Sequence, residues 1–283
     1  MRKILSLVLA ALMISALCLI SASCGSNDKS DLNKIKKAGV LKVGMECNYA
    51  PFNWTQANNS EGAVALASGG YAAGYDVKMA SIVAESLGVK LEIVKLEWEG
   101  LIDALNSGVI DCIIAGMSAT EDRKLSIDFT NNYYSSELVL VVKKGSAYEG
   151  ATSLSDFAGA KVTGQLGTFH YDVISQIQGV NKLDPMNDFP TMIIALQAGT
   201  IDAYVSERPG AVSAQAANSD LTFVEFDDGN GFSVSDDEVS VAVGVRKGSD
   251  LTTLINQTLA NVSEQTRNQY MNEAVQNQPV SED

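Results

Sequence analysis

The chain has 283 residues, of which 46% are hydrophobic and 19% are charged. This composition is that of a globular protein, and the length suits one large domain or two small ones. The formal net charge is −14, which argues against nucleic acid as a ligand because nucleic-acid-binding proteins need a basic face.

The first residues predict an export signal. Arg2 and Lys3 precede an apolar stretch over residues 4–20, and the small residues 21–23 follow it. A basic segment, an apolar core and small residues ahead of a cleavage point are typical of a signal peptide. A permanent membrane anchor is the alternative, but the stretch is shorter than the ~20 residues that a spanning helix needs. We therefore assign residues 1–23 to a signal peptide.

Cys24 stands directly after the small residues and is followed by the polar stretch GSN at 25–27. This arrangement resembles the processing site of bacterial lipoproteins, although Ser21 stands where that motif usually has leucine. The resemblance implies a lipid on Cys24 and attachment to the cell membrane through it. Residues 24–36 are then a lipid-anchored tether, and the folded part faces the extracellular or periplasmic side.

Behind the tether, strands and helices alternate. The residue spacing predicts strand, helix, strand, helix and strand in this order, over residues 41–45, 76–87, 91–96, 100–106 and 110–115. Short strands that alternate with helices indicate a parallel sheet covered on both faces. The stretch 55–74 has no consistent period and many small residues, so we interpret it as a surface excursion between the first strand and the first helix.

Two cysteines fall in the folded part, and in an exported protein such a pair could form a disulfide. Cys47 follows the first strand, whereas Cys112 lies near the start of the strand predicted at 110–115. If these strands are parallel neighbours, the two residues lie several positions apart along them, at ~3.3 Å per residue. That separation exceeds disulfide reach, so we predict two free thiols.

An internal repeat indicates a second lobe. Residues 104–111 read ALNSGVID and residues 195–202 read ALQAGTID. Each copy has the end of a helix, a glycine suited to the C-terminal turn of that helix, and a strand entered through Ile-Asp. Together with the alternation around them, the two copies suggest two lobes of the same architecture.

Polar side chains follow the strand of each copy. They are Ser118, Thr120 and Arg123 in the first copy, and Ser206 and Glu207 in the second. Ligands of open α/β sheets bind beyond the carboxyl ends of the strands, so two facing lobes would present a guanidinium and a carboxylate to one ligand. Such a pair of charges suits a zwitterion. The alternative is that both residues are solvated at the surface or pair with each other.

A set of motifs accompanies these features between residues 40 and 270. In chain order they are GMECNYAPFNW (44–54), GYDVKMASIVAESLG (74–88), LEWEGLIDALNSGVIDCIIAGMSATEDR (96–123), IDFTNNYY (127–134), AKVTGQLGTFHY (160–171) and IDAYVSERP (201–209). In this order they resemble the polar-amino-acid-binding proteins of bacterial ABC importers, the family 3 type of extracellular solute-binding protein. The resemblance implies the two-lobed periplasmic-binding-protein fold of type II. In this α/β fold, each lobe is a mostly parallel sheet flanked by helices, and two strands cross between the lobes.

The resemblance also implies domain boundaries. Lobe 1 takes residues 37–132 and 242–283, and lobe 2 takes residues 138–236. The two crossovers, residues 133–137 and 237–241, act as hinges about which the lobes close on a ligand.

Carried over residue by residue, the binding site of the family falls first on groups that hold the α-carboxylate and α-ammonium. Arg123 matches the arginine that clamps the carboxylate with two parallel hydrogen bonds. Ser118 and the backbone at Gly116 match further contacts to either group. Glu207 matches the acidic residue that accepts the ammonium, although the family more often has aspartate there. Thr168 opens a helix and matches a second contact to the carboxylate, since a helix N-terminus favours an anion.

The remaining matches face the side chain of the ligand. Tyr49 and Trp98 match aromatic residues that sandwich it, with core packing as their alternative role. Glu46 matches an acidic position at its far end, and Gln165 lies on the loop of Thr168. A carboxylate and aromatic faces favour a cationic amino acid, arginine ahead of lysine, with a polar neutral one such as glutamine as the alternative.

The resemblance implies a non-enzymatic substrate-binding component, which captures a polar amino acid and delivers it to the permease subunits of an ABC importer. We expect a monomer without a cofactor. A binding module for a sensory receptor is the second interpretation, and an enzyme on the same fold is the third. The sequence disfavours an enzyme. His170, expected on the helix after Thr168, is the only histidine, no nucleophile elbow stands near it, and no Cys/His cluster offers a metal site.

Overall fold

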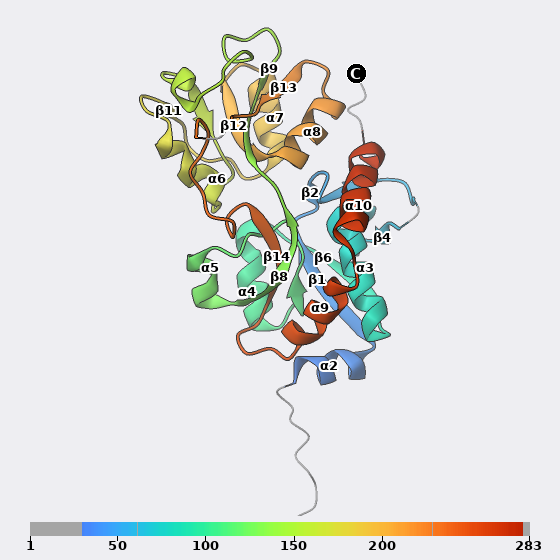
Figure 1. The fold of residues 1–283 in the computed structure, drawn as a ribbon. Helices are drawn as coiled ribbons and strands as arrows, with labels where there is room; N and C mark the ends of the chain where they lie inside the picture. The colour runs from blue at the N-terminus through green and yellow to red at the C-terminus, as the bar shows by residue number, and fades with distance from the viewer. Residues whose placement is uncertain (1–29, 61, 228, 280–283) are drawn as a thin grey trace, which may run out of the picture.

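The computed structural model describes residues 30–60, 62–227 and 229–279, which form two lobes (Figure 1). Each lobe is built on a five-stranded sheet with helices packed against it, and the chain passes between the two sheets twice. The predicted two-lobed α/β fold is therefore confirmed. The predicted signal peptide and Cys24 lie outside the described residues.

Lobe 1 contains the first sheet, with the strand order β6-β1-β7-β14-β8. Its strands are β1 (Val40–Met45), β6 (Lys90–Lys95), β7 (Cys112–Ile113), β8 (Asp128–Ser135) and β14 (Ser240–Val245). Its helices are α2 (Asp31–Ala38), α3 (Tyr75–Leu87), α4 (Leu101–Ser107), α5 (Glu121–Ser126), α9 (Leu251–Ala260) and α10 (Glu264–Asn277), with a 3-10 turn η1 (Trp98–Gly100) before α4. The predicted elements are present with ends shifted by one residue, except that the strand expected at 110–115 is only the short β7.

Lobe 2 contains the second sheet, with the strand order β11-β10-β12-β9-β13. Its strands are β9 (Leu138–Lys143), β10 (Lys161–Thr163), β11 (Asn181–Lys182), β12 (Ala203–Glu207) and β13 (Leu221–Val224). Its helices are α6 (Phe169–Asp172), α7 (Phe189–Gln197) and α8 (Arg208–Ala217), with 3-10 turns η2 (Leu154–Phe157) and η3 (Val173–Gln176). Among the helices of the described residues, none has the length and apolar character needed to cross a membrane.

Both sheets combine a parallel half with an antiparallel half, so the expected parallel arrangement holds for one half of each. In lobe 1, β1 lies parallel to β6 and β7, whereas β14 lies antiparallel to β7 and β8. In lobe 2, β10 lies parallel to β11 and β12, whereas β9 lies antiparallel to β12 and β13. The chain leaves lobe 1 after β8 and returns to it at β14, where Ser240 pairs with Ser135. The two crossovers therefore start and end side by side.

The internal repeat corresponds to equivalent units of the two lobes. In the first copy, α4 ends at Gly108, whose φ is 79°, and leads into β7. In the second copy, α7 leads through Gly199, whose φ is 73°, into β12. Each of these strands is third in its sheet, with a parallel neighbour on one side and an antiparallel neighbour on the other. The shared architecture predicted from the repeat is confirmed.

The segment expected as a surface excursion contributes to a small antiparallel sheet on lobe 1. Its strand order is β2-β3-β5-β4, and its strands are β2 (Asn48–Tyr49), β3 (Asn53–Gln56), β4 (Val64–Ala65) and β5 (Tyr71–Ala73). Leu66 and Ala72 are buried, so the segment is more than an exposed loop. Strands of two to four residues are too short to show a period, which is why the sequence pattern missed them.

The first helix occupies part of the predicted tether. Ser30 caps α2 by accepting a hydrogen bond from the helix backbone, and Ile35 is buried against lobe 1. The Asp31 carboxylate pairs with Arg246, with 3.0 Å between Oδ2 and Nε. This contact joins residues that are far apart in the chain, so local sequence patterns do not reveal it. Residues 31–36 therefore belong to the folded part.

Cys47 and Cys112 are both buried free thiols, which confirms the prediction. Cys112 lies opposite Val43 in the parallel pairing of β1 with β7, several positions before Cys47. Burial raises the pKa of Cys47 to about 12, so this thiol stays protonated at neutral pH.

Candidate binding site between the lobes

A small cavity lies where the two lobes meet. Its lining residues are Tyr49, Trp98, Gly116, Ser118, Arg123, Gln165, Thr168, Phe169 and His170. Seven of the nine predicted binding residues are among them, whereas Glu46 and Glu207 each contact a lining residue instead. The free volume is about 10 Å³, room for about one water molecule, so the cleft is closed and the lobes must part to admit an amino acid.

Arg123 bridges the two lobes. Its Nη1 donates to the carbonyl of Ser118 at 2.9 Å, and its Nη2 donates across the cleft to the carbonyl of Gly167 at 3.2 Å. The guanidinium carbon lies 5.0 Å from the ring centre of Trp98, within cation–π range. Burial lowers the pKa of Arg123 to about 10 against the opposing charges of Glu207 and Asp172, so the group remains charged at neutral pH.

Ser118 and Gly116 are engaged within lobe 1 and the crossover. The Ser118 hydroxyl donates to the carbonyl of Glu238 at 2.8 Å, and the Gly116 N–H donates to the Tyr133 hydroxyl at 3.2 Å. Gly116 has a φ of 60°, and a Cβ there would lie 2.8 Å from the ring of Tyr49. Only glycine therefore lets the backbone approach this ring so closely.

Thr168 and Gln165 form the lobe 2 side of the cavity. The Thr168 hydroxyl donates to the carbonyl of Gln165 at 2.7 Å, and Thr168 is the N-cap residue of α6. This helix was predicted, but it has only four residues before η3 continues the chain. Its dipole is correspondingly small, so the expected attraction of an anion by the helix N-terminus is weaker than the resemblance implied.

Glu46 is a buried carboxylate at the edge of the site. Its Oε2 accepts a hydrogen bond from Gln165 Nε2 at 2.9 Å, whereas its Oε1 is buried without a hydrogen-bond partner in the described residues. Burial raises its pKa to about 7, and the negative charges of Asp188, Glu97 and Asp76 act in the same direction. The carboxyl group thus titrates near neutral pH and has one free acceptor.

Glu207 ends β12 and is 2% exposed. One carboxylate oxygen accepts a hydrogen bond from the Tyr49 hydroxyl, and the other lies 2.9 Å from His170 Nε2. Burial raises the pKa of Glu207, but the charge of His170 and the bond from Tyr49 outweigh it and hold the pKa below its ordinary value. Glu207 is therefore ionised at neutral pH.

The two predicted aromatic residues differ in their packing. Tyr49 is 3% exposed and stacks on Phe189 of lobe 2, with ring centres 4.3 Å apart, and on Phe52 of lobe 1. Trp98 is half-buried, and its Nε1 donates to the carbonyl of Gly167 at 3.4 Å. Tyr49 therefore packs in the hydrophobic core and also lines the cavity, whereas Trp98 lies at the rim of the cleft and contacts the opposite lobe.

Phe169 and His170 line the cavity but were not among the predicted binding residues. His170 lies on α6 after Thr168, as expected, and both residues are buried. The sequence could have indicated them through their position directly after Thr168, because the first residues of a helix lie close to its N-cap residue.

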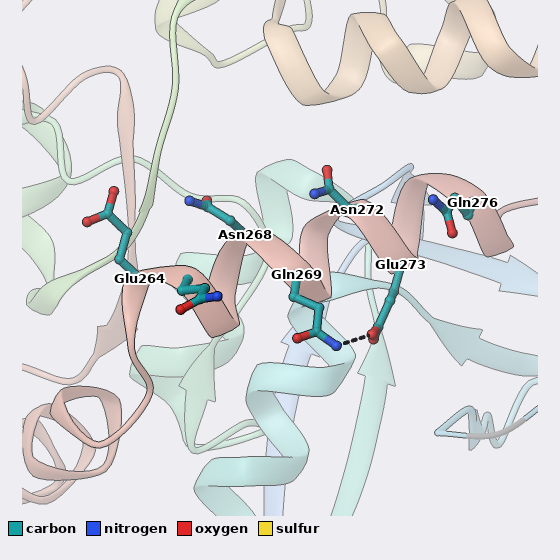
Figure 2. A pocket seen from close by; sticks show the side chains of 7 residues that line it. Glu264, Asn268, Gln269, Asn272, Glu273 and Gln276 are labelled. Carbon is teal, nitrogen blue, oxygen red and sulfur yellow. Dashed lines mark hydrogen bonds between the residues drawn. The ribbon is translucent and has the colours of Figure 1, made fainter.

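A larger hollow lies outside the cleft, along one side of α10 (Figure 2). Its lining side chains are all acidic or amide groups, and they are Glu264, Gln265, Asn268, Gln269, Asn272, Glu273 and Gln276. Gln269 donates to Glu273 at 2.8 Å, as Figure 2 shows. No group of three or more metal-ligating side chains occurs anywhere in the described ranges. We read this hollow as an open polar surface.

Comparison of the sequence with known proteins shows the family of this chain. Residues 41–274 match the model of a family described as bacterial extracellular solute-binding proteins, family 3. A probable histidine-binding protein of Campylobacter jejuni is 31% identical over 241 residues, which cover 84% of this chain and 87% of the relative. The arginine-binding extracellular protein ArtP of Bacillus subtilis is 29% identical over 264 residues, which cover 92% of each chain.

A solved structure supports the fold in the same way. It is an amino acid ABC transporter substrate-binding protein from Streptococcus pneumoniae bound to L-arginine, with a TM-score of 0.77 and 28% sequence identity. The match covers 87% of this chain and 98% of that one. The family match extends from β1 into α10 and so includes both lobes. The chain belongs to the bacterial extracellular solute-binding proteins of family 3.

Proposed function

We propose that this protein captures a free amino acid between its lobes, without changing it chemically, and delivers it to the permease subunits of an ABC importer. The observation that carries the proposal is the pair of opposite charges at the closed cleft. Arg123 comes from lobe 1 and Glu207 from lobe 2, and both are ionised at neutral pH. They suit the α-carboxylate and the α-ammonium of an amino acid. Membership of the family supports this role.

The hydrogen bonds at the closed cleft indicate how the ligand is held. The carbonyl of Gly167 occupies one arm of the Arg123 guanidinium, and the carbonyl of Gln165 occupies the Thr168 hydroxyl. A ligand carboxylate between the lobes takes the place of the neutral carbonyl at Arg123, because a charged acceptor bonds a guanidinium more strongly than a neutral one. Ser118 and the backbone at Gly116 lie beside the same position.

For the ligand we propose a polar amino acid, with a cationic one favoured and arginine ahead of lysine. The buried Oε1 of Glu46 lacks a partner, and a cationic head group would supply one. Trp98 contacts the guanidinium of Arg123, so aromatic rings of this site can stack on a planar cation. The names of two compared proteins, ArtP and the Streptococcus pneumoniae protein, also refer to arginine. Glutamine is the alternative, since its amide could donate to Glu46.

A thermal-shift screen of the common amino acids, followed by calorimetry, tests this function. We expect L-arginine or another polar amino acid to raise the melting temperature by mass action. Glu46→Gln should lower the affinity for L-arginine steeply and that for L-glutamine modestly. A screen in which acidic or aliphatic amino acids stabilise best would refute the ligand class, and a screen without any hit would refute the function.

We propose further that Cys24 carries the lipid that holds the protein at the membrane. The motif around Cys24 supports this, and α2 fixes the start of the folded part to lobe 1. Cys24→Ala should release the protein from the membrane fraction or leave the signal uncleaved, as fractionation and mass measurement would show. An unchanged distribution with normal processing would contradict lipidation.

A further inference from the structure

Among the titratable side chains that line the cavity, His170 is the one to which the proposed function assigns no role. It is 4% exposed and lies on the short helix α6, between the ring of Phe169 and that of Phe189. Its Nε2 lies 2.9 Å from Glu207 Oε1, at ion-pair distance. Neither ring nitrogen makes a hydrogen bond of good geometry in the described residues. The imidazole is therefore buried at ion-pair distance from the carboxylate.

The charged groups around His170 come from four elements. Glu207 on β12 is in contact, and the Tyr49 hydroxyl on β2 is bonded to the same carboxylate. Arg123 on α5 lines the same cavity, and Asp172 follows on α6. In the closed cleft, the negative charge of Glu207 thus stabilises a positively charged His170, whereas the positive charge of Arg123 destabilises it. A second cation brought to Glu207 reverses the balance against the imidazolium.

An amino-acid ligand brings such a cation. Both oxygens of Glu207 are already occupied, one by Tyr49 and one by His170. Tyr49 belongs to lobe 1, so its hydroxyl leaves the carboxylate when the lobes part to admit a ligand, whereas His170 and Glu207 both belong to lobe 2 and stay together. An incoming α-ammonium therefore reaches the carboxylate oxygen that Tyr49 vacates and adds a second cation beside His170.

We propose that His170 is a protonatable counter-ion of Glu207 that gives up its proton when the α-ammonium of the ligand reaches the same carboxylate. This inference rests on the proposed function. When the ligand binds, the imidazolium loses its proton to solvent, and the ammonium becomes the cation that balances the carboxylate. Histidine ordinarily changes charge between about pH 5 and 8, so ligand binding releases a proton in mildly acidic solution and weakens as the pH falls.

Because His170 is the only histidine of the chain, its protonation can be read directly. NMR of the untagged mature protein, labelled at the imidazole, is titrated between pH 5 and 8 with and without L-arginine, and again with L-glutamine. We expect either ligand, once bound, to shift the resonance to the neutral form at a pH where the free protein is half protonated. The response to glutamine is informative because its side chain carries no charge that could act on His170.

Calorimetry of His170→Gln gives a second measurement. At about pH 5.5, the wild type should release up to one more proton per bound ligand than the variant. The affinity of the wild type should fall by up to about tenfold per pH unit as the pH is lowered there, which is steeper than the fall for the variant. Glu46 also titrates near this range, but it is present in both proteins, so only the difference is attributed to His170. Gln276→Ala, an exposed change on α10 that does not line the cavity, should keep the proton release of the wild type.

The outcomes separate this inference from the proposed function. If an amino acid binds but the His170 resonance does not respond to it, the inference is wrong and the proposed function stands. Equal proton release by the wild type and His170→Gln has the same meaning. If none of the common amino acids binds, both the proposed function and the inference are wrong.

Discussion

The two ionised side chains at the cleft are both engaged before any ligand group replaces their partners. The Arg123 guanidinium is bonded to two backbone carbonyls, and the Glu207 carboxylate is bonded to Tyr49 and adjoins His170. A charge that is buried and then deprived of its partner costs several kcal/mol, so these contacts keep the closed cleft stable. In the proposed function the same contacts are exchanged for those of the ligand, so we expect substitutions of both residues to affect binding strongly.

Arg123→Met is expected to weaken amino-acid binding by about two orders of magnitude or more, since truncating one member of a buried charge pair costs ~2–5 kcal/mol. Calorimetry measures the affinity, and circular dichroism verifies the fold. Asp122→Asn, an exposed change on the same helix that does not line the cavity, serves as the control and should bind like the wild type. Near-normal affinity in folded Arg123→Met would exclude Arg123 from the site.

Glu46 should make the protein less stable as the pH rises through neutrality. Its pKa is about 7 in the folded state and 4.5 ordinarily, so the folded protein binds the proton more tightly than the unfolded chain does. Below pH ~4.5 the carboxyl group is protonated in both states and does not change the free energy of unfolding with pH. Between pH ~5 and ~8 its ionisation lowers the free energy of unfolding by roughly 2–3 kcal/mol.

Denaturant unfolding of the wild type and of Glu46→Gln at the two pH values measures this effect. The glutamine can still accept the hydrogen bond from Gln165, and all other titrating groups, Asp76 included, are common to both proteins. The wild type should lose more stability than the variant between the lower and the higher pH. Equal losses would show that Glu46 titrates near its ordinary pKa.

At the scale of elements, α10 connects the lobes a third time. It packs on α3 of lobe 1 and on α8 of lobe 2 (Figure 1). Just beyond its end, the Gln278 amide donates to the carbonyl of Ser213 at 3.0 Å and accepts a hydrogen bond from the Ser213 hydroxyl. Both residues are buried, and α8 begins directly after Glu207. The C-terminal helix, assigned to lobe 1 by the resemblance, thus also holds the lobe 2 helix that starts at the site.

Gln278→Ala removes two buried hydrogen bonds between these elements, each of which contributes ~0.5–1.5 kcal/mol. We expect a lower melting temperature and a weaker affinity for the amino acid, because the lost bonds stabilise the closed arrangement of the lobes. Gln276→Ala, on an exposed position of the same helix, should leave both unchanged. If Gln278→Ala matches Gln276→Ala in both measurements, the hydrogen bonds of Gln278 do not contribute to closure.

At the scale of the whole molecule, the two lobes share one hydrophobic core across their interface. The buried cluster of lobe 1 continues through Tyr49 to Phe189 and on to Met192 and Tyr204 of lobe 2. The other face of the lobe 2 sheet has a separate cluster around Phe157. Opening the cleft therefore exposes apolar surface near Tyr49, which favours closure once ligand is bound.

We predict that X-ray scattering gives a smaller radius of gyration with saturating L-arginine than without it. The closed cleft has room for about one water molecule, so an amino acid must enter while the lobes are apart. The Arg123→Met protein under the same conditions should show no change. A radius of gyration that is the same with and without ligand in the wild type would contradict the hinge assignment of residues 133–137 and 237–241.

The sequence by itself determined the alternation of strands and helices, the two-lobed plan and most of the residues that line the cavity between the lobes. Helix ends at Gly108 and Gly199 are local signals, because a left-handed glycine terminates a helix whatever its surroundings. Ser118 and Arg123 could be placed near a ligand because they follow a buried strand, and strands of one sheet end at the same edge.

Only the tertiary structure decided which side chains meet across the cleft. The contacts of Glu207 with Tyr49, of Glu46 with Gln165 and of Tyr49 with Phe189 join different segments of the chain. No local period records such contacts, since they form only where the two lobes meet. The same holds for α2, where the ion pair of Asp31 with Arg246 attaches a short polar helix that the sequence pattern assigned to a tether.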